Sequence, residues 1–144
     1  MKKDAFLLFP RRYNFFLDFL QLTILFIENK IKISFFIKII AEIFRILQKK
    51  RHSRFLNFIN MFFNLLLCKT SPFFFYFKNN KNILGIKLSI RGKLKGKPRS
   101  SIYTRVFGSV PTQTLSCNIE YAKTHAFTIY GVFGIHLWIH RIIL

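Results

Sequence analysis

Acidic residues are scarce in this sequence, because five Asp and Glu stand against 24 Lys and Arg among 144 residues. Hydrolysis and phosphoryl transfer need a general base oriented by a further polar group, or carboxylates that hold a metal ion. Glu120 is the only acid that follows Glu42, so neither arrangement can be assembled. We therefore expect a protein that is not an enzyme, with no catalytic residues and no cofactor.

Cysteine is rarer still, with only Cys68 and Cys117. The two lie 49 residues apart, which excludes the paired spacing of a structural zinc site. We expect free thiols in a reducing compartment and no metal site. Cys117 alternates with Leu115 and Ile119, so we expect it to be buried in a strand rather than to act as a nucleophile or ligand.

A long uninterrupted apolar run is also missing. A helix that crosses a membrane needs about 20 predominantly apolar residues, but Asp18 interrupts the stretch 13–27 and three asparagines lie within 55–67. We therefore expect no membrane span. The amino terminus lacks the continuous apolar segment and the cleavage site of a signal peptide.

Ala, Gly and Pro together supply only 14 residues, whereas Phe, Ile, Lys and Asn supply 64. The favoured residues have AT-rich codons and the scarce ones have GC-rich codons. Folding does not require 20 phenylalanines in a basic domain. The bias therefore indicates an AT-rich genome, and an organelle fits best. We expect a protein that is encoded and works in a mitochondrion.

The charge that is present has one sign, with a net value of +19. Solubility asks for a magnitude of only about 2 to 8 in a small domain. The excess indicates a polyanionic partner, which is either nucleic acid or an anionic membrane surface. A basic organelle protein associated with a membrane, without enzymatic activity, is therefore the alternative to a nucleic-acid-binding protein.

The spacing of apolar residues predicts helices followed by strands. Apolar residues recur at helical intervals in 37–47 and in 55–67, and the basic segment 49–54 joins these two helices. From residue 85 they alternate with polar residues in three runs, which are Ile86, Leu88 and Ile90; Leu115, Cys117, Ile119 and Tyr121; and Ile135, Leu137 and Ile139. The pattern predicts an α+β fold, with amphipathic helices on one face of a small antiparallel sheet.

Four segments make the second half of the sequence specific. They are GIKLSIRGKLKG (85–96), FGSVPTQTL (107–115), NIEY (118–121) and TIYGVFGIHLWI (128–139). In this order and at these separations they resemble the carboxy-terminal domain of small-subunit ribosomal protein three. On this resemblance, 55–144 corresponds to that domain, with an insert at 69–82. The segment 37–54 resembles the end of a type II KH domain, and 1–36 is an unassigned extension.

The resemblance implies a structural constituent of a mitochondrial ribosome that takes part in translation. The family binds rRNA in the head of the small subunit, beside the channel through which messenger RNA (mRNA) enters and close to other head proteins. Small-subunit rRNA, mRNA and neighbouring head proteins are therefore the expected partners. Either a separate chain supplies the KH half of the family or that half has been lost. Such a chain should sit against the apolar face of 37–47, which otherwise lacks a complete partner.

Two basic segments are the candidate RNA-binding sites, and each could instead be a solvated surface. The first is the loop 91–99, whose glycines let the backbone approach phosphates while its cations replace counterions. The second is 49–54, whose counterpart in the family carries cations toward the mRNA channel. Phe55 and Phe58 replace further basic residues of the family there, so the unwinding of mRNA is in doubt. The candidate residues are Arg91, Lys93, Lys95, Lys97, Arg99, Arg105, Lys49, Lys50, Arg51 and Arg54.

His136 and His140 form an HxxxH pattern that would suit zinc on a helix. On a strand, at about 3.3 Å per residue, they lie about 13 Å apart, so we expect no metal binding. Trp138 lies between them on the same side of the strand. We expect His136, Trp138 and His140 to face outward and contact RNA or a neighbouring protein, unless a helix covers them.

Overall fold

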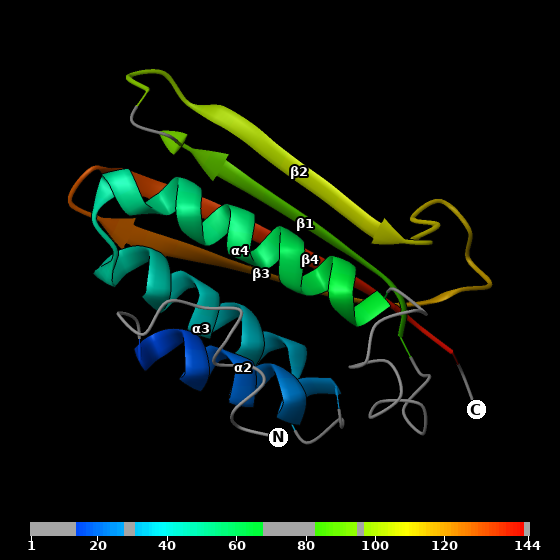
Figure 1. The fold of residues 1–144 in the computed structure, drawn as a ribbon. Helices are drawn as coiled ribbons and strands as arrows, with labels where there is room; N and C mark the ends of the chain where they lie inside the picture. Colours follow the sequence, from blue (N-terminus) through cyan, green and yellow to red (C-terminus); the bar gives the residue numbers. More distant parts are fainter. Residues whose placement is uncertain (1–13, 28–30, 68–82, 95–96, 143–144) are drawn as a thin grey trace.

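Three helices precede four strands in residues 14–27, 31–67, 83–94 and 97–142, the part of the chain that the computed structural model describes (Figure 1). The helices are α2 (Asn14–Ile27), α3 (Ile33–Ile46) and α4 (Lys49–Leu67). The strands are β1 (Ile83–Gly92), β2 (Ser101–Gly108), β3 (Asn118–Thr128) and β4 (Gly131–Arg141). The predicted order of helices followed by strands is confirmed.

The strands form one antiparallel sheet in the order β2-β1-β4-β3, so β2 and β3 are its edges. Helices α3 and α4 lie across one face of this sheet (Figure 1). No helix of the described residues lies on the opposite face, which we call the open face. It carries alternate strand residues, such as Lys87, Ser89 and Arg91 of β1. The predicted α+β fold with helix on one face is therefore confirmed.

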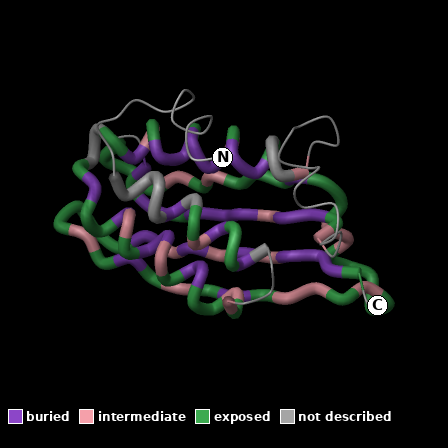
Figure 2. Tube along the Cα trace, turned by 60° about the horizontal axis from the view of Figure 1, so that its bottom comes forward, coloured by how far each residue is buried: buried purple, intermediate pink, exposed green. Residues whose placement is uncertain are grey.

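The two inner strands owe their place to strict alternation. Ile86, Leu88 and Ile90 of β1 are at most 3% exposed, and the isoleucines and leucine at 135, 137 and 139 of β4 are fully buried. Figure 2 shows these buried stretches along the strands. Branched aliphatic side chains at every second position fit a pleated surface that is covered on one side. The predicted inward residues of β1 and β4 are confirmed.

Phenylalanine rings join α2 to the other helices. The Phe19 ring centroid lies 5.8 Å from that of Phe36 in α3 and 5.9 Å from that of Phe55 in α4. Phe26 stacks on Phe36 at 4.5 Å. All four side chains are at most 2% exposed, and such ring pairs add stability beyond the area that they bury. Part of the segment 1–36 therefore belongs to the core.

The apolar face of α3 is covered within this chain. Ile37, Ile40 and Phe44 are at most 1% exposed, and α3 packs against β3, β4 and α2. The expectation that this face lacks a complete partner is therefore wrong, because α2 and the sheet supply the missing contacts.

The basic segment 49–54 is helical, whereas the sequence pattern indicates a connection between helices. Helix α3 ends at Ile46, Leu47 has an extended backbone (φ −74°, ψ 137°), and α4 already begins at Lys49. The prediction of a separate basic connection is therefore wrong. Arg51 and Arg54 are exposed in the first turns of α4.

The second predicted run of alternation, 115–121, is wrong in extent and in face. Leu115 is fully exposed in a turn, and β3 begins only at Asn118. The buried residues of β3 are Ala122 and Ala126, whereas Tyr121 is 48% exposed. Cys117 is partly exposed in the same turn, where its Sγ accepts a hydrogen bond from the Thr114 hydroxyl (3.2 Å). Its predicted burial in a strand is therefore wrong. Cys68 and the insert predicted at 69–82 lie outside the described residues.

Candidate nucleic-acid interface

A buried histidine closes the corner between α3 and α4. His52, near the start of α4, is 0% exposed, and its Nε2 donates a hydrogen bond to the Leu47 carbonyl oxygen (3.0 Å). Its ring meets those of Phe44 and Phe133 edge to face, at centroid distances of 5.2 and 5.4 Å. Burial lowers the pKa of His52 and outweighs the opposing effect of backbone hydrogen bonds. The neutral ring therefore holds the first turns of α4 against the core.

Phe133 also fixes the start of the β1–β2 connection. A Cβ at Gly92 would lie 2.4 Å from Cδ1 of Phe133, so the absence of a side chain lets β1 pass this ring closely. Leu94 is 2% exposed, and its carbonyl oxygen accepts a hydrogen bond from the N–H of Lys97 (3.2 Å). The connection is therefore rooted in the core, while Lys93 and Lys97 on either side of Leu94 are exposed.

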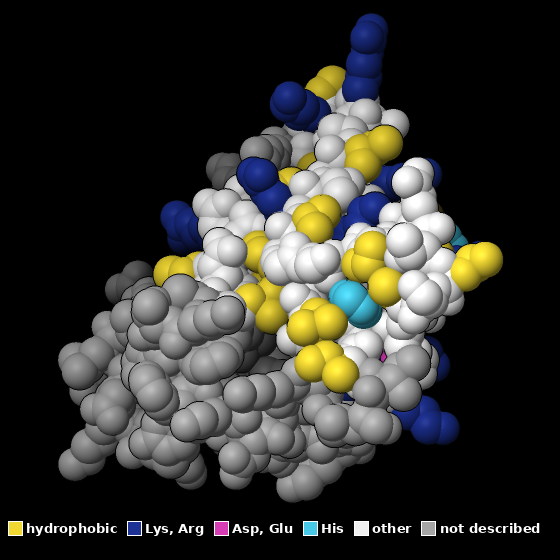
Figure 3. Space-filling model, turned by 90° about the vertical axis from the view of Figure 1, so that its right-hand side faces the viewer, with side chains coloured by type: hydrophobic (Ala, Val, Ile, Leu, Met, Phe, Trp, Pro, Cys, Tyr) yellow, Lys and Arg dark blue, Asp and Glu magenta, His cyan; other side chains and the backbone are white. Residues whose placement is uncertain are grey.

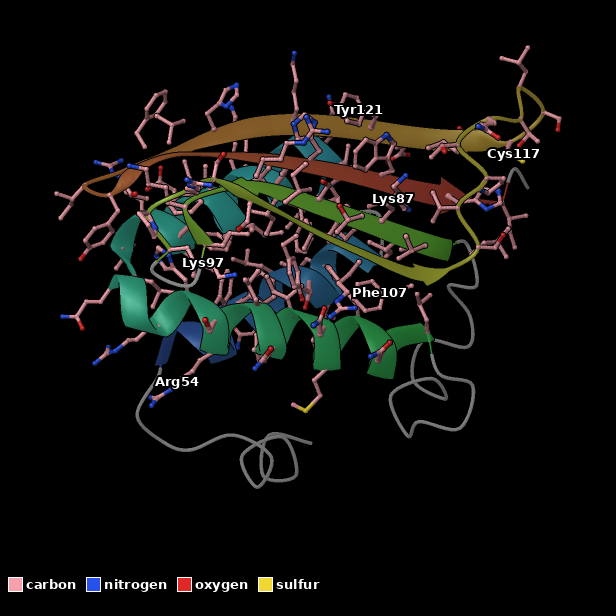
Figure 4. All side chains as sticks on the ribbon, turned by 90° about the horizontal axis from the view of Figure 1, so that it is seen from above. Arg54, Lys87, Lys97, Phe107, Cys117 and Tyr121 are labelled. Carbon is pink, nitrogen blue, oxygen red and sulfur yellow. The ribbon has the colours of Figure 1, made fainter. Side chains whose placement is uncertain are left out.

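The two basic segments lie at one end of the molecule, although they are far apart in the sequence. Lys and Arg side chains stand at the top of the molecule in Figure 3, where Figure 1 has the β1–β2 connection. In Figure 4, Arg54 of α4 and Lys97 of that connection lie at the same end. We call this surface the basic end and define it by five exposed residues, Arg51, Arg54, Lys93, Lys97 and Arg99.

Two acidic side chains of the described residues form ion pairs with arginines outside the basic end. Glu42 pairs with Arg45 on the exposed side of α3 (3.5 Å). Glu120 pairs with Arg141 (3.1 Å) where β3 begins, at the opposite end of the sheet from the β1–β2 connection (Figure 1). Neither carboxylate therefore pairs with one of the five residues that define the basic end.

Arg91 and Arg105 extend the charge along β1 and β2 on different faces. Arg91 is exposed on the open face. Arg105 pairs in register with Leu88, so it lies on the helix side of the edge strand, with its guanidinium 5.5 Å from the Tyr103 ring. A single nucleic-acid strand that binds the basic end can reach Arg91 along the open face, whereas Arg105 lies on the other side of the sheet.

Three further predicted RNA-binding residues complete the two segments. Lys49 and Lys50 are the first residues of α4, so their backbone lies at the basic end. Lys95 lies outside the described residues. Its neighbours Lys93 and Lys97 are exposed. RNA binding by Lys49, Lys50 and Lys95 stays a prediction.

A cluster of rings occupies the open face. The Tyr121 hydroxyl and Nδ1 of His136 share a hydrogen bond of 2.7 Å. The Trp138 ring lies 5.2 Å from that of Tyr121 and 5.9 Å from that of His136, between centroids, and Nζ of Lys87 lies 5.1 Å from its centroid. We call Lys87, Tyr121, His136 and Trp138 the ring cluster. Figure 4 shows Tyr121 on the side of the sheet away from α4.

The electrostatic potential at the ring cluster is positive. Burial is the largest cause that lowers the pKa of His136, and the charges of Arg91, Lys123 and His125 lower it further. Lys123 stands opposite His136 in the register of β3 and β4, and both residues lie on the open face. The open face therefore joins aromatic surface to cations.

His140 is separate from the ring cluster. It is 8% exposed, and its Nδ1 donates a hydrogen bond to the Ser109 carbonyl oxygen (2.9 Å). The β2–β3 connection can approach here because Gly85 has no side chain, since a Cβ would lie 2.4 Å from the same oxygen. Of the three residues expected to face outward together, His136 and Trp138 are partly exposed, while His140 holds a connection in place.

The sequence pattern does not single out Lys87, Tyr121 and Lys123 as candidate residues. Lys87 alternates with the buried residues of β1, which places it on the open face. The alternation in 115–121 predicts an apolar inward side that includes Tyr121, so the sequence pattern assigns Tyr121 to the core in error. The small inward residues Ala122 and Ala126 are the signal that would have corrected this assignment.

Neither a metal site nor a membrane-spanning helix is found in the described part of the chain. No three His, Cys, Asp or Glu side chains gather closely enough there to hold a metal ion. No described helix combines the length and the hydropathy that crossing a bilayer requires.

Comparison with known proteins matches the part of the chain that forms the sheet. The family model for ribosomal protein S3, C-terminal domain, matches residues 75–139. Small ribosomal subunit protein uS3 of Thermomicrobium roseum is 39% identical over 57 residues, which are 40% of this chain and 26% of that protein. The uS3c protein of Physcomitrium patens is 47% identical over 60 residues, with 42% and 28% covered. The uS3c protein of Staurastrum punctulatum is 44% identical over 64 residues, with 44% and 29% covered.

The chain thus spans about a quarter of the length of the curated relatives that it matches. The family match begins inside the segment 69–82 and ends two residues before the end of β4. All four sequence segments that carry the resemblance lie within it. Their order, the antiparallel sheet and the helices on one face agree with the match, and this part of the chain belongs to the family of ribosomal protein S3 C-terminal domains.

Proposed function

We propose that this protein is a structural, non-enzymatic constituent of a small ribosomal subunit and binds rRNA through its basic end. The observation that carries the proposal is the convergence of two distant basic segments on one surface, one of them within the S3 family match. Matched relatives are small ribosomal subunit proteins. Cations that neutralise phosphates release condensed counterions, which favours binding without base specificity.

The geometry of the basic end suits a phosphate backbone. Leu94 and His52 anchor its two segments in the core, and the Lys and Arg side chains beside them are exposed. Phosphate contacts of this kind fix the orientation of a protein on RNA. The positive charge here therefore acts as a positioning surface for folded rRNA.

The finer placement follows the resemblance. We place the protein in a mitochondrial ribosome, in the head of the small subunit beside the mRNA channel, with mRNA and neighbouring head proteins as further partners. The bias toward residues with AT-rich codons and the organelle-type uS3c relatives support an organelle. A separate chain with a KH half is a further proposed partner. Because the apolar face of α3 is covered, that chain would contact a different surface.

Salt dependence of binding tests the proposal. The triple variant K93A/K95A/K97A removes three cations from the segment 91–99, two of which belong to the basic end. The magnitude of the slope of log affinity against log salt, measured on a head-rRNA fragment, should fall by about 2 to 3. The control K32A/K38A removes two exposed cations from α3 and its N-terminal flank, and should leave the slope unchanged. Circular dichroism checks that both variants fold. Equal slopes for the wild type and the first variant would place RNA binding elsewhere.

A membrane-associated basic protein remains the rival function, since an anionic bilayer also attracts a charge of +19. Sedimentation separates the two. A ribosomal constituent should migrate with the small subunit after detergent treatment and leave it only at high salt. Recovery with lipid after a carbonate wash, without the small subunit, would favour the rival.

A further inference from the structure

We propose that the open face of the sheet binds a single RNA strand that leaves the basic end, with unpaired bases on the ring cluster. Lys87, Arg91 and Lys123 would contact its phosphates, and the rings of Tyr121 and Trp138 its bases. This inference rests on the proposed rRNA binding and adds a second surface with a different chemistry.

Ring geometry is the first argument. The rings of His136 and Trp138 are nearly parallel, with 16° between their planes, and the Tyr121 hydroxyl is hydrogen-bonded to His136. Tyr121 is 48% exposed although it stands on a strand beside the core. Three rings in mutual contact on one face of the sheet form a preorganised stacking surface, and base stacking on aromatic side chains tolerates any base.

Charge is the second argument. Lys87, Arg91 and Lys123 lie on the same face, on the central strand β1 and the edge strand β3. Glu120 pairs in register with Ile139, so it lies on the helix side. No described acidic side chain lies on the open face. The amine of Lys87 is 5.1 Å from the centroid of the Trp138 ring. A nucleotide whose phosphate binds Lys87 would therefore have its base close to the rings.

Continuity with the basic end is the third argument. Arg91 lies two residues before Lys93, so the open face begins where the basic end stops. Along β1, Arg91, Ser89 and Lys87 succeed one another on the open face, and Arg91 and Lys87 are about 13 Å apart at about 3.3 Å per residue. An RNA strand that follows this path passes Ser89, beside which His136 and Lys123 lie in register. It then reaches Lys87, beside which Trp138 and Tyr121 lie in register.

The chemistry favours a single strand over a duplex. Double-stranded RNA hides the faces of its bases and is recognised by shape and by backbone contacts, whereas unpaired bases stack on aromatic side chains. The cations of the basic end alone can bind the phosphates of a duplex. The ring cluster adds recognition only for unpaired nucleotides.

Trp138 is the only tryptophan in the chain, which gives a direct readout. We would titrate the full chain with an oligouridine of about 12 nucleotides, within the range of known single-strand site sizes, and with a matched RNA duplex. The single strand should quench the emission of Trp138 in a saturable way, and the duplex should bind without quenching it. Y121A should weaken single-strand binding about 5- to 150-fold, as loss of one stacking contact does.

Two variants serve as controls. Y121F retains the ring without the hydroxyl, so it should bind within about twofold of the wild type, since stacking needs only the ring. F35A removes an aromatic side chain that is 52% exposed on α3, on the helix side, and should leave binding unchanged. Circular dichroism confirms that each variant folds.

The outcomes separate this inference from the proposed function. If Y121A binds the single strand as tightly as F35A does, while K93A/K95A/K97A still lowers the salt slope, the open face is not an RNA surface and the proposed function stands. If the wild type binds neither RNA, both proposals fail. In purified small subunits, cross-links from Lys87 or Lys123 to another protein, without a nucleotide on the ring cluster, would assign the open face to a protein and overturn the inference.

Discussion

Replacing His52 with phenylalanine tests how the core supports the basic end. The variant keeps a ring between Phe44 and Phe133 but loses the hydrogen bond from Nε2 to the Leu47 carbonyl oxygen, which is 3.0 Å long and buried. A buried carbonyl left without a partner costs about 1 to 3 kcal/mol. We therefore expect the free energy of unfolding of H52F to be lower than that of the wild type by this amount near neutral pH.

The pH dependence gives a second, sharper expectation. Burial lowers the pKa of His52 in the folded state below the ordinary value of about 6.5. Above about pH 6.5 both states are neutral at this site, and the contribution of His52 to stability is complete. Below it the unfolded state takes up the proton first, so the wild type loses stability at no more than about 1.4 kcal/mol per pH unit. H52F lacks this loss, and its deficit relative to the wild type should shrink as the pH falls.

Urea unfolding between about pH 7.5 and pH 5, followed by circular dichroism, measures both effects. The wild type and H52F are compared at each pH, so that contributions from other groups, including His136 with its lowered pKa, cancel. H125F, an exchange at an exposed position of β3, serves as the matched control and should change stability by less than about 0.5 kcal/mol. A deficit of H52F that stays constant or grows toward low pH would refute the reasoning.

Two smaller predictions concern the connections of the sheet. G85A should destabilise the protein by about 1 to 3 kcal/mol, because its Cβ would lie 2.4 Å from the Ser109 carbonyl oxygen. The control G134A should stay within about 0.5 kcal/mol of the wild type in the same urea assay, because the nearest atoms to its Cβ would lie at 3.9 Å. C117S should also stay within about 0.5 kcal/mol, because Cys117 lies in a turn, and a deficit of several kcal/mol would indicate a buried thiol instead.

The inner strands could be predicted from the sequence because their two faces differ sharply in chemistry. Ile and Leu alternate with Lys, Ser and Arg in β1, and the same contrast marks 135–139 in β4. One face of each strand is covered by helices, so a shift of one residue would bury charge. Such strands have one acceptable register, and periodicity alone identifies their inward residues.

The edge strand β3 could not be predicted in the same way. Its inward residues Ala122 and Ala126 are small, and α3 packs directly over this strand. The larger residues Ile119 and Tyr121 lie on the open face. Hydropathy weights the large side chains, so it assigns the wrong face where a helix packs closely on small residues. The same error removed Tyr121 from the candidate site.

The charges of the candidate interface could be predicted from the sequence, but the proximity of the two basic segments could not. The cations of 49–54 and of 91–99 are plain in the sequence, yet no local pattern places the two segments together. Their juxtaposition depends on Phe133, a residue of a third segment. Its ring contacts the ring of His52, and it also packs against Gly92, where a side chain would clash with it. A change at Phe133 would therefore separate the two halves of the basic end without removing a single charge, and RNA affinity would fall through geometry rather than through electrostatics.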